Sequence, residues 1–200
     1  MALRELLCAY GLQSLGECPD GDTKIVLIGP LEPAFWQIFT DSDEYNDGAG
    51  DPMDRWSQRV LAQIGATLGA EPLFPFTGPP FAPFFTWALK SGRFWTSPIG
   101  FLVHDQAGLF ASFRGALRMP GKAQLQAPVN PCDSCPRPCT TACPVGAFAG
   151  GYNVAACKTH VQSQDGQDCR TGGCLARRAC PIGQGDRLPA QSAFHMEAFL

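Results

Sequence analysis

A helical repeat of apolar residues is the clearest pattern in the first half of the chain. Asp51 and Pro52 suit the N-cap and first turn of a helix, and Gly69 suits its end. Between them, apolar side chains recur every three or four positions, as on one helix face: Trp56, Val60, Leu61, Ile64 and Leu68. The pattern predicts a helix between Pro52 and Gly69.

Shorter patterns before this helix predict two more helices and a strand. Residues 3–11 form a short helix candidate, and the β-branched run KIVLIG at residues 24–29 predicts a buried strand. Pro30 then opens a predicted helix that includes Phe35 and Phe39.

After the long helix, two strand-like runs at residues 99–104 and 109–117 flank the turn-like residues 105–108 and predict a hairpin. Helices and strands in this order predict an α+β fold, with a layered α/β domain in the N-terminal part.

Composition and charge exclude several classes of protein. The chain has 200 residues, 45% of them hydrophobic and 16% charged, which is typical of a globular protein. Its net charge of −3 gives no reason to expect nucleic-acid binding. Residues 72–89 carry no charge but contain five prolines, which argues against a membrane-spanning helix. Arg4 and Glu5 interrupt the pattern of a secretory signal, so we predict a cytoplasmic protein without a membrane partner.

Cysteines divide the chain into two parts. Of the ten cysteines, only Cys8 and Cys18 precede residue 132, and the acidic first half changes to a basic second half after a linker-like stretch, GKAQLQAPVNP. We therefore expect an α/β domain at residues 1–121 and a cysteine-rich domain at residues 122–200.

The chemistry of the second part follows from its cysteine spacing. Cys132, Cys135, Cys139 and Cys143 follow the pattern C-x2-C-x3-C-x3-C, with Pro144 next. Bacterial ferredoxins use C-x2-C-x2-C-x3-C-P, so this run has one extra residue before its third cysteine. A second group also ends in Cys-Pro: Cys157, Cys169, Cys174 and Cys180. The two groups predict two [4Fe-4S] clusters.

In two-cluster ferredoxins the last cysteine of each run binds the cluster of the other run. Applied to this chain, cluster one takes Cys132, Cys135, Cys139 and Cys180. Cluster two takes Cys143, Cys157, Cys169 and Cys174. Crossed ligation of this kind holds two clusters close together, which suits electron transfer.

Other interpretations of the cysteines remain open. Two structural zinc sites also use eight thiolates, although the Cys-Pro endings have no role there, and disulfides fit a reducing compartment poorly. Basic residues among the ligands either offset the negative charge of the clusters or form a docking face for an acidic redox partner; they are Arg137, Lys158, Arg170, Arg177 and Arg178.

The order of cysteine motifs over residues 132–181 resembles the dicluster ferredoxin module of epoxyqueuosine reductases and, more distantly, of reductive dehalogenases. Both families place such clusters beside a cobalamin. Residues 74–121 look like the nitroreductase-type, corrinoid-binding domain of the cobalamin-processing decyanase family, with landmarks at His104, Gly108 and Arg114. The resemblance implies an electron-transfer module on a reduced corrinoid-type scaffold and assigns no catalytic residue.

An aromatic and proline-rich segment is where a corrinoid pocket would lie, although large apolar residues are more often core. Its candidate lining residues are Phe74, Phe76, Phe81, Phe84, Trp87 and, further along, His104.

We expect an iron-sulfur electron carrier that serves a redox partner protein. One alternative is a corrinoid-dependent reductase or corrinoid-processing enzyme fed by the two clusters. Another is an interaction domain stapled by metal.

Overall fold

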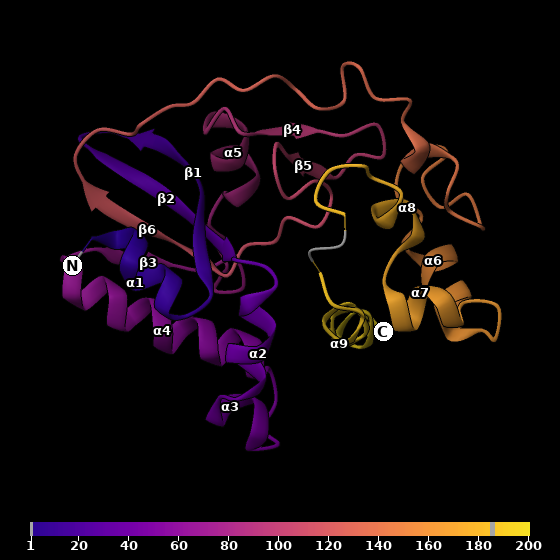
Figure 1. Ribbon diagram of the computed structural model, residues 1–200, viewed down its shortest axis with the longest axis horizontal. Helices are drawn as coiled ribbons and strands as arrows, with labels where there is room; N and C mark the ends of the chain where they lie inside the picture. The colour runs from indigo at the N-terminus through magenta and orange to yellow at the C-terminus, as the bar shows by residue number, and fades with distance from the viewer. Residues whose placement is uncertain (1, 185–186) are drawn as a thin grey trace. The chain divides into compact units, whose positions relative to one another are not determined.

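The computed structural model describes residues 2–184 and 187–200, which form two compact units (Figure 1). The first unit runs up to Phe94 and includes 111–128, and the second comprises 95–110 and 129–200. This division differs from the predicted boundary at residues 121 and 122 in two segments, because 95–110 groups with the cysteine-rich part and 122–128 with the first unit. The chain combines helices with antiparallel strands and is therefore an α+β protein.

A four-stranded sheet forms the centre of the first unit. Its order is β1 (Leu12–Asp20), β2 (Thr23–Pro30), β6 (Gly115–Pro120) and β3 (Glu71–Leu73), and each neighbouring pair is antiparallel. The predicted strand at residues 24–29 is confirmed as β2. Sequence analysis missed β1, whose pattern is interrupted by glycine, proline and a register shift between Ser14 and Gly16.

Helices α4 (Pro52–Leu68) and α5 (Phe84–Lys90) cover opposite faces of this sheet. A Cβ on Gly115 would lie 2.5 Å from Leu61 Cδ1 of α4, whereas a Cβ on Gly16 would lie 3.0 Å from Ser91, which ends α5. Gly115 pairs with Ile28 and Gly16 with Leu27. Because neighbouring residues of a strand point to opposite faces, the two contacts lie on opposite sides of the sheet.

The predicted helices of the first unit are confirmed, with two corrections. Pro30 does not open a helix: it is the last residue of β2, and the helix predicted there begins at Ala34. Apolar residues of α4 are buried as expected, among them Trp56 and Ile64. Asp51 occupies the N-cap position but has a left-handed backbone, with φ 50°, and its side chain makes no capping hydrogen bond within the described chain. The remaining helices are α1 (Leu3–Ala9), α2 (Ala34–Thr40) and the short α3 (Asp43–Asn46).

The predicted hairpin at residues 99–117 is wrong. Its turn exists, because His104 and Gly108 exchange two backbone hydrogen bonds of 3.0 Å. However, β5 (Leu102–His104) pairs with β4 (Phe94–Thr96), and β6 pairs with β2 and β3. The apolar pattern identified strand-forming residues but could not show that the chain passes from one unit to the other after residue 110.

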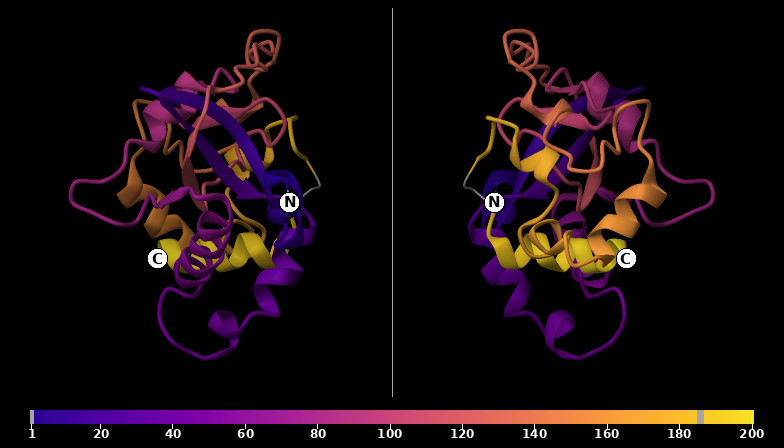
Figure 2. Two further views of the ribbon diagram at one scale, coloured as in Figure 1. Left: turned by 90° about the vertical axis from the view of Figure 1, so that its left-hand side faces the viewer. Right: turned by 90° about the vertical axis from the view of Figure 1, so that its right-hand side faces the viewer.

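The second unit is built from short helices. They are the 3-10 helix η1 (Pro138–Thr140) and the α-helices α6 (Val154–Gln162), α7 (Gln167–Gly172), α8 (Leu175–Arg178) and α9 (Pro189–Phe199). Helix α9 packs against α7 (Figures 1 and 2). The unit's core contains Ile99, Val103 and Leu109 together with the cysteines Cys139 and Cys180. None of the helices in the described ranges has the length and apolar character needed to cross a membrane.

Candidate metal centre

Cys180 lies close to the cysteines of the first motif, although it is far from that motif in the sequence. Burial raises the pKa of Cys132, and the thiols of Cys135, Cys180 and Cys139 raise it further. The pKa of Cys139 is likewise raised, first by burial and then by Cys180 and Cys135. Thiols affect one another in this way only when they are close. The structure therefore brings together the four residues assigned to cluster one.

Local backbone geometry turns the first motif inward. Arg137 adopts a left-handed conformation with φ 58°, and its N–H group donates to Cys135 Sγ at 3.3 Å. Asn130 Oδ1 accepts from the N–H group of Cys132 at 3.0 Å. Helix η1 follows and buries Cys139. These turns and hydrogen bonds fix the backbone around Cys132, Cys135 and Cys139.

The four cysteines assigned to cluster two line one cavity. It encloses about 320 Å³ of space between protein atoms, including its opening to solvent. The remaining lining residues are mainly apolar: Pro144, Val145, Phe148, His160, Val161, Leu175, Ala176 and Met196. An apolar wall around thiolates excludes water, which is one of the protein's means of setting the potential of an iron-sulfur cluster.

Two helices, the N-cap of a third and one turn carry these four cysteines. Cys157 lies on α6, Cys169 on α7, and Cys174 directly precedes α8. Cys143 lies in a turn, where its Sγ accepts from the N–H group of Ala147 at 3.3 Å. Burial raises the pKa of Cys174, and the backbone N–H groups at the start of α8 oppose this rise. The second unit thus directs backbone donors at its sulfurs.

Arg177 supplies positive charge next to the second set of cysteines. Its side chain is partly buried, which lowers its pKa, and the nearby Cys174 opposes this effect. The Arg177 Nε atom donates to the Leu109 backbone oxygen at 2.6 Å. Because a cubane with four thiolates is anionic, a fixed guanidinium beside it would offset part of that charge.

His160 has a buried ring nitrogen that lacks a partner. The residue lines the cavity of the second set, and its Nε2 atom makes no hydrogen bond to any described residue. A buried polar atom of this kind normally has a partner. His160 lines the same cavity as four thiols, where a cluster would provide sulfur acceptors.

The donor set fits iron-sulfur chemistry better than a single metal ion. Within the described ranges, no three His, Cys, Asp or Glu side chains converge closely enough to hold one ion. A cubane is different, because each thiolate binds its own iron at a separate corner. Eight cysteines, partly or fully buried and surrounded by apolar residues and N–H donors, match the soft ligands that such clusters require.

The residues proposed for a corrinoid pocket have several different environments. Phe74 and Phe76 stack with their ring centroids 5.3 Å apart. Phe84 and Trp87 are buried, and their ring centroids lie 5.2 Å apart. Phe81, in contrast, is 64% exposed. These five residues lie in the first unit.

His104 lies in the second unit and holds a turn together. Its Nδ1 atom accepts from the N–H groups of Gln106 and Ala107 at 3.2 and 3.1 Å. Its Nε2 atom lies 3.1 Å from Asp105 Oδ1. Both ring nitrogens therefore have protein partners, which fixes the proton on Nε2 in the neutral ring.

Sequence reasoning named all eight cysteines but passed over their surroundings. His160 was not among the site residues predicted from the sequence, although its position three residues after Cys157 on a helix places the two side chains on one face. Sequence reasoning named Arg177 only as one of several basic residues. The partial burial of this side chain beside Cys174 depends on tertiary packing, for which the sequence carries no local signal.

The two cysteines outside the sets should differ sharply in reactivity. Cys8 is exposed, whereas Cys18 is buried and its pKa is raised to about 11, mainly by burial. Since the thiolate is the reactive form, we expect iodoacetamide to modify Cys8 in the native protein and Cys18 only after unfolding. Peptide mass spectrometry after timed alkylation measures both rates, and comparable rates would contradict this environment for Cys18.

The cysteine sets are the part of the chain with the most specific chemistry, and their geometry is the basis for assigning a function. Comparison of the whole chain with protein-family models gave no match, and comparison with curated proteins gave no significant match.

Proposed function

We propose that this protein is an electron-transfer protein that carries two [4Fe-4S] clusters. The observation that carries the proposal is the grouping of the cysteines across the two motifs. Cys180 lies close enough to the first motif to raise the pKa of its thiols, and Cys143 shares a cavity with the cysteines of the second motif. This arrangement is the one that crossed ligation in a dicluster ferredoxin requires.

Residues of the second unit would have separate roles in such a protein. The clusters, when bound, supply the one-electron redox chemistry. The cysteine thiolates hold them, backbone N–H groups at Cys135, Cys143 and Cys174 stabilise negative charge on sulfur, and Arg177 offsets it. Cysteines of both sets also border one hydrophobic core. This shared core supports placing the clusters near each other, as electron transfer between them requires.

Anaerobic redox titration of the intact chain tests the proposed function. We expect about two electrons per chain to bleach the visible absorption reversibly, one for each cluster. Electron paramagnetic resonance of the reduced form should show two interacting centres. A protein that holds zinc and takes up no electrons would contradict the proposal and support a metal-stapled interaction domain.

His160 offers a more local prediction. If Nε2 donates to the second cluster, replacing His160 with phenylalanine removes a donor that favours the more negative, reduced state. We expect the potential of that cluster to fall by roughly 40 mV, corresponding to about 1 kcal/mol for one electron. Potentiometry of both clusters measures the shift.

The other cluster provides the internal control for this variant. Its potential should stay unchanged in His160→Phe, because His160 lines only the cavity of the second set among the cavities described above. A shift of equal size in both clusters would indicate a general structural effect and contradict a direct bond from His160.

A further inference from the structure

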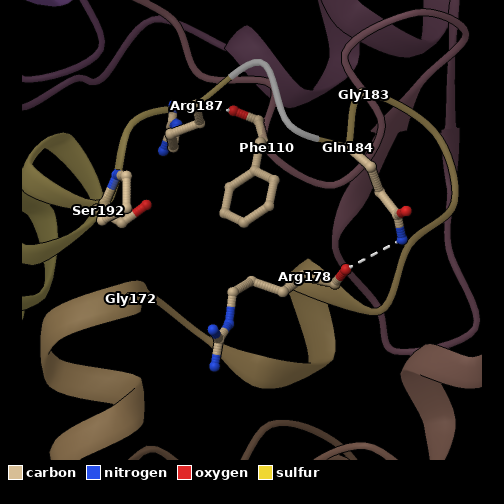
Figure 3. Close-up of a pocket in the computed structure, with 8 residues that line it drawn as sticks. Phe110, Gly172, Arg178, Gly183, Gln184, Arg187 and Ser192 are labelled. Atoms are coloured by element: carbon tan, nitrogen blue, oxygen red, sulfur yellow. Dashed lines mark hydrogen bonds between the residues drawn. The ribbon is translucent and has the colours of Figure 1, made fainter.

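A second cavity in the cysteine-rich unit is lined by residues that the proposed clusters do not use. Its volume is about 380 Å³, near the lower end of the range for small-molecule sites, roughly 300–1,000 Å³. It is lined by Phe110, Gly172, Arg178, Gly183, Gln184, Arg187, Pro189 and Ser192 (Figure 3). Among the described residues that line it, none is a cysteine or carries a carboxylate.

Two arginines from different segments give this cavity a positive charge. Arg187 donates through Nη2 to the Phe110 backbone oxygen at 3.1 Å, and its Cζ atom lies 5.1 Å from the centre of the Phe110 ring. Arg178 Nη2 lies 2.6 Å from Asp168 Oδ2. Asp168 is largely exposed, so solvent screens this ion pair and it neutralises Arg178 only in part.

Arg178 has neighbours both at its guanidinium and at its backbone. A Cβ on Gly172 would lie 3.0 Å from Arg178 Nη1, so the guanidinium packs against a position where a larger residue would crowd it. The Gln184 amide donates to the Arg178 backbone oxygen at 3.4 Å, as Figure 3 shows. The Arg178 Nε atom is nevertheless buried with no hydrogen-bond partner in the described part of the chain. A buried donor of this kind normally has a partner.

The N-terminus of α9 adds to the positive potential. Pro189, the first residue of this 11-residue helix, and Ser192 in its first turn both line the cavity. The N-cap residue Leu188 has an apolar side chain that cannot cap the helix. The positive end of the helix dipole, which favours anions, is therefore available at the cavity.

We propose that this cavity binds the phosphate group of a small anionic ligand. Arg178 on α8 and the segment that carries both Arg187 and the start of α9 each offer positive charge to the cavity. Donors from two segments suit a tetrahedral dianion with acceptors in several directions better than a planar carboxylate. The cavity is also larger than one phosphate ion requires, which leaves room for a small organic group. The Phe110 ring already has the guanidiniums of Arg177 and Arg187 near it, each 5.1 Å from its centre.

Isothermal titration of the full chain with inorganic phosphate and with glycerol 3-phosphate, at constant ionic strength, tests the proposal. We expect saturable binding of one ligand per chain. Arg187→Gln should weaken it about tenfold or more, as for loss of a charged hydrogen bond. Lys122→Gln removes the same charge at an exposed position in the first unit and should leave affinity within about twofold. The tighter of the two probes identifies the source of the phosphate group.

Two milder variants keep the test decisive if Arg187→Gln fails to fold. Arg187→Lys retains the charge but loses the planar fork, and Gly172→Ala crowds the Arg178 guanidinium. Each should weaken phosphate binding several-fold while the circular dichroism spectrum stays native. Absence of saturable binding of both probes to the unaltered protein would overturn the proposal. An equal loss in Lys122→Gln would also overturn it, because binding would then depend only on net charge.

Discussion

Replacing Cys180 with alanine is expected to remove one cluster and spare the other, lowering the iron content from about eight to about four atoms per chain. Cys180 lies with Cys132, Cys135 and Cys139, although Cys174 and its group are closer in sequence. The surviving cluster should therefore be the one held by Cys143, Cys157, Cys169 and Cys174. Iron analysis combined with electron paramagnetic resonance of the reduced variant measures the loss and identifies the remaining centre.

Matched variants separate crossed ligation from general damage. Cys143→Ala should give the mirror result, with loss of the second cluster and retention of the first, because Cys143 lines the cavity of the second set. Cys8→Ala, an exposed cysteine outside both sets, should retain full iron content. If Cys180→Ala lost the cluster held by Cys157, each motif would bind its own cluster and the crossed assignment would be wrong.

Removal of iron is expected to loosen the second unit far more than the first. The core of the second unit includes the side chains of Cys139 and Cys180 and borders other cysteines, and its helices are short. Such a unit depends on metal binding for much of its folding free energy. We expect amide exchange there to rise about 100-fold or more on anaerobic chelation, while the sheet of the first unit stays protected. Hydrogen exchange with mass spectrometry measures both units in one experiment.

Residues 95–110 make this experiment specific. They precede the cysteine motifs in sequence but belong to the second unit. Arg177 Nε donates a hydrogen bond to the Leu109 backbone oxygen, and a Cβ on Gly108 would lie 3.2 Å from Cys180 Sγ. These residues should therefore lose protection together with 129–200. Protection that stays unchanged in the iron-free form, or that falls equally across the β1–β2 pair, would contradict a unit stabilised by its metal.

Elements with a strong local pattern were predictable from the sequence. The apolar repeat of α4 gives the helix one apolar face, and the β-branched run makes β2 apolar along its length. Both are buried in the fold, so the local preference for helix or strand agrees with the tertiary packing. Strand β1 was missed because Gly16 and Pro19 weaken its pattern, and pairing along β2 compensates for this. The hairpin prediction failed because neighbouring strands in sequence found partners in different sheets.

The candidate site also has a part that was predictable from the sequence and a part that was not. Cysteine identity and spacing are written in the sequence, and motif rules were enough to assign eight residues to two sets. The surroundings of those sets depend on which helices pack together. The partly buried charge of Arg177, the unpaired Nε2 of His160 and the two-arginine cavity all bring together residues from separate segments. No periodicity or short motif connects such residues before folding.

The central claim is that eight cysteines of the second unit hold two iron-sulfur cubes. Quantitative analysis of iron, acid-labile sulfide, zinc and cobalt in the protein purified without oxygen tests it most directly. We predict about eight iron and eight sulfide per chain, with negligible zinc. A fully folded, colourless protein that contains zinc, or no metal at all, would contradict the claim.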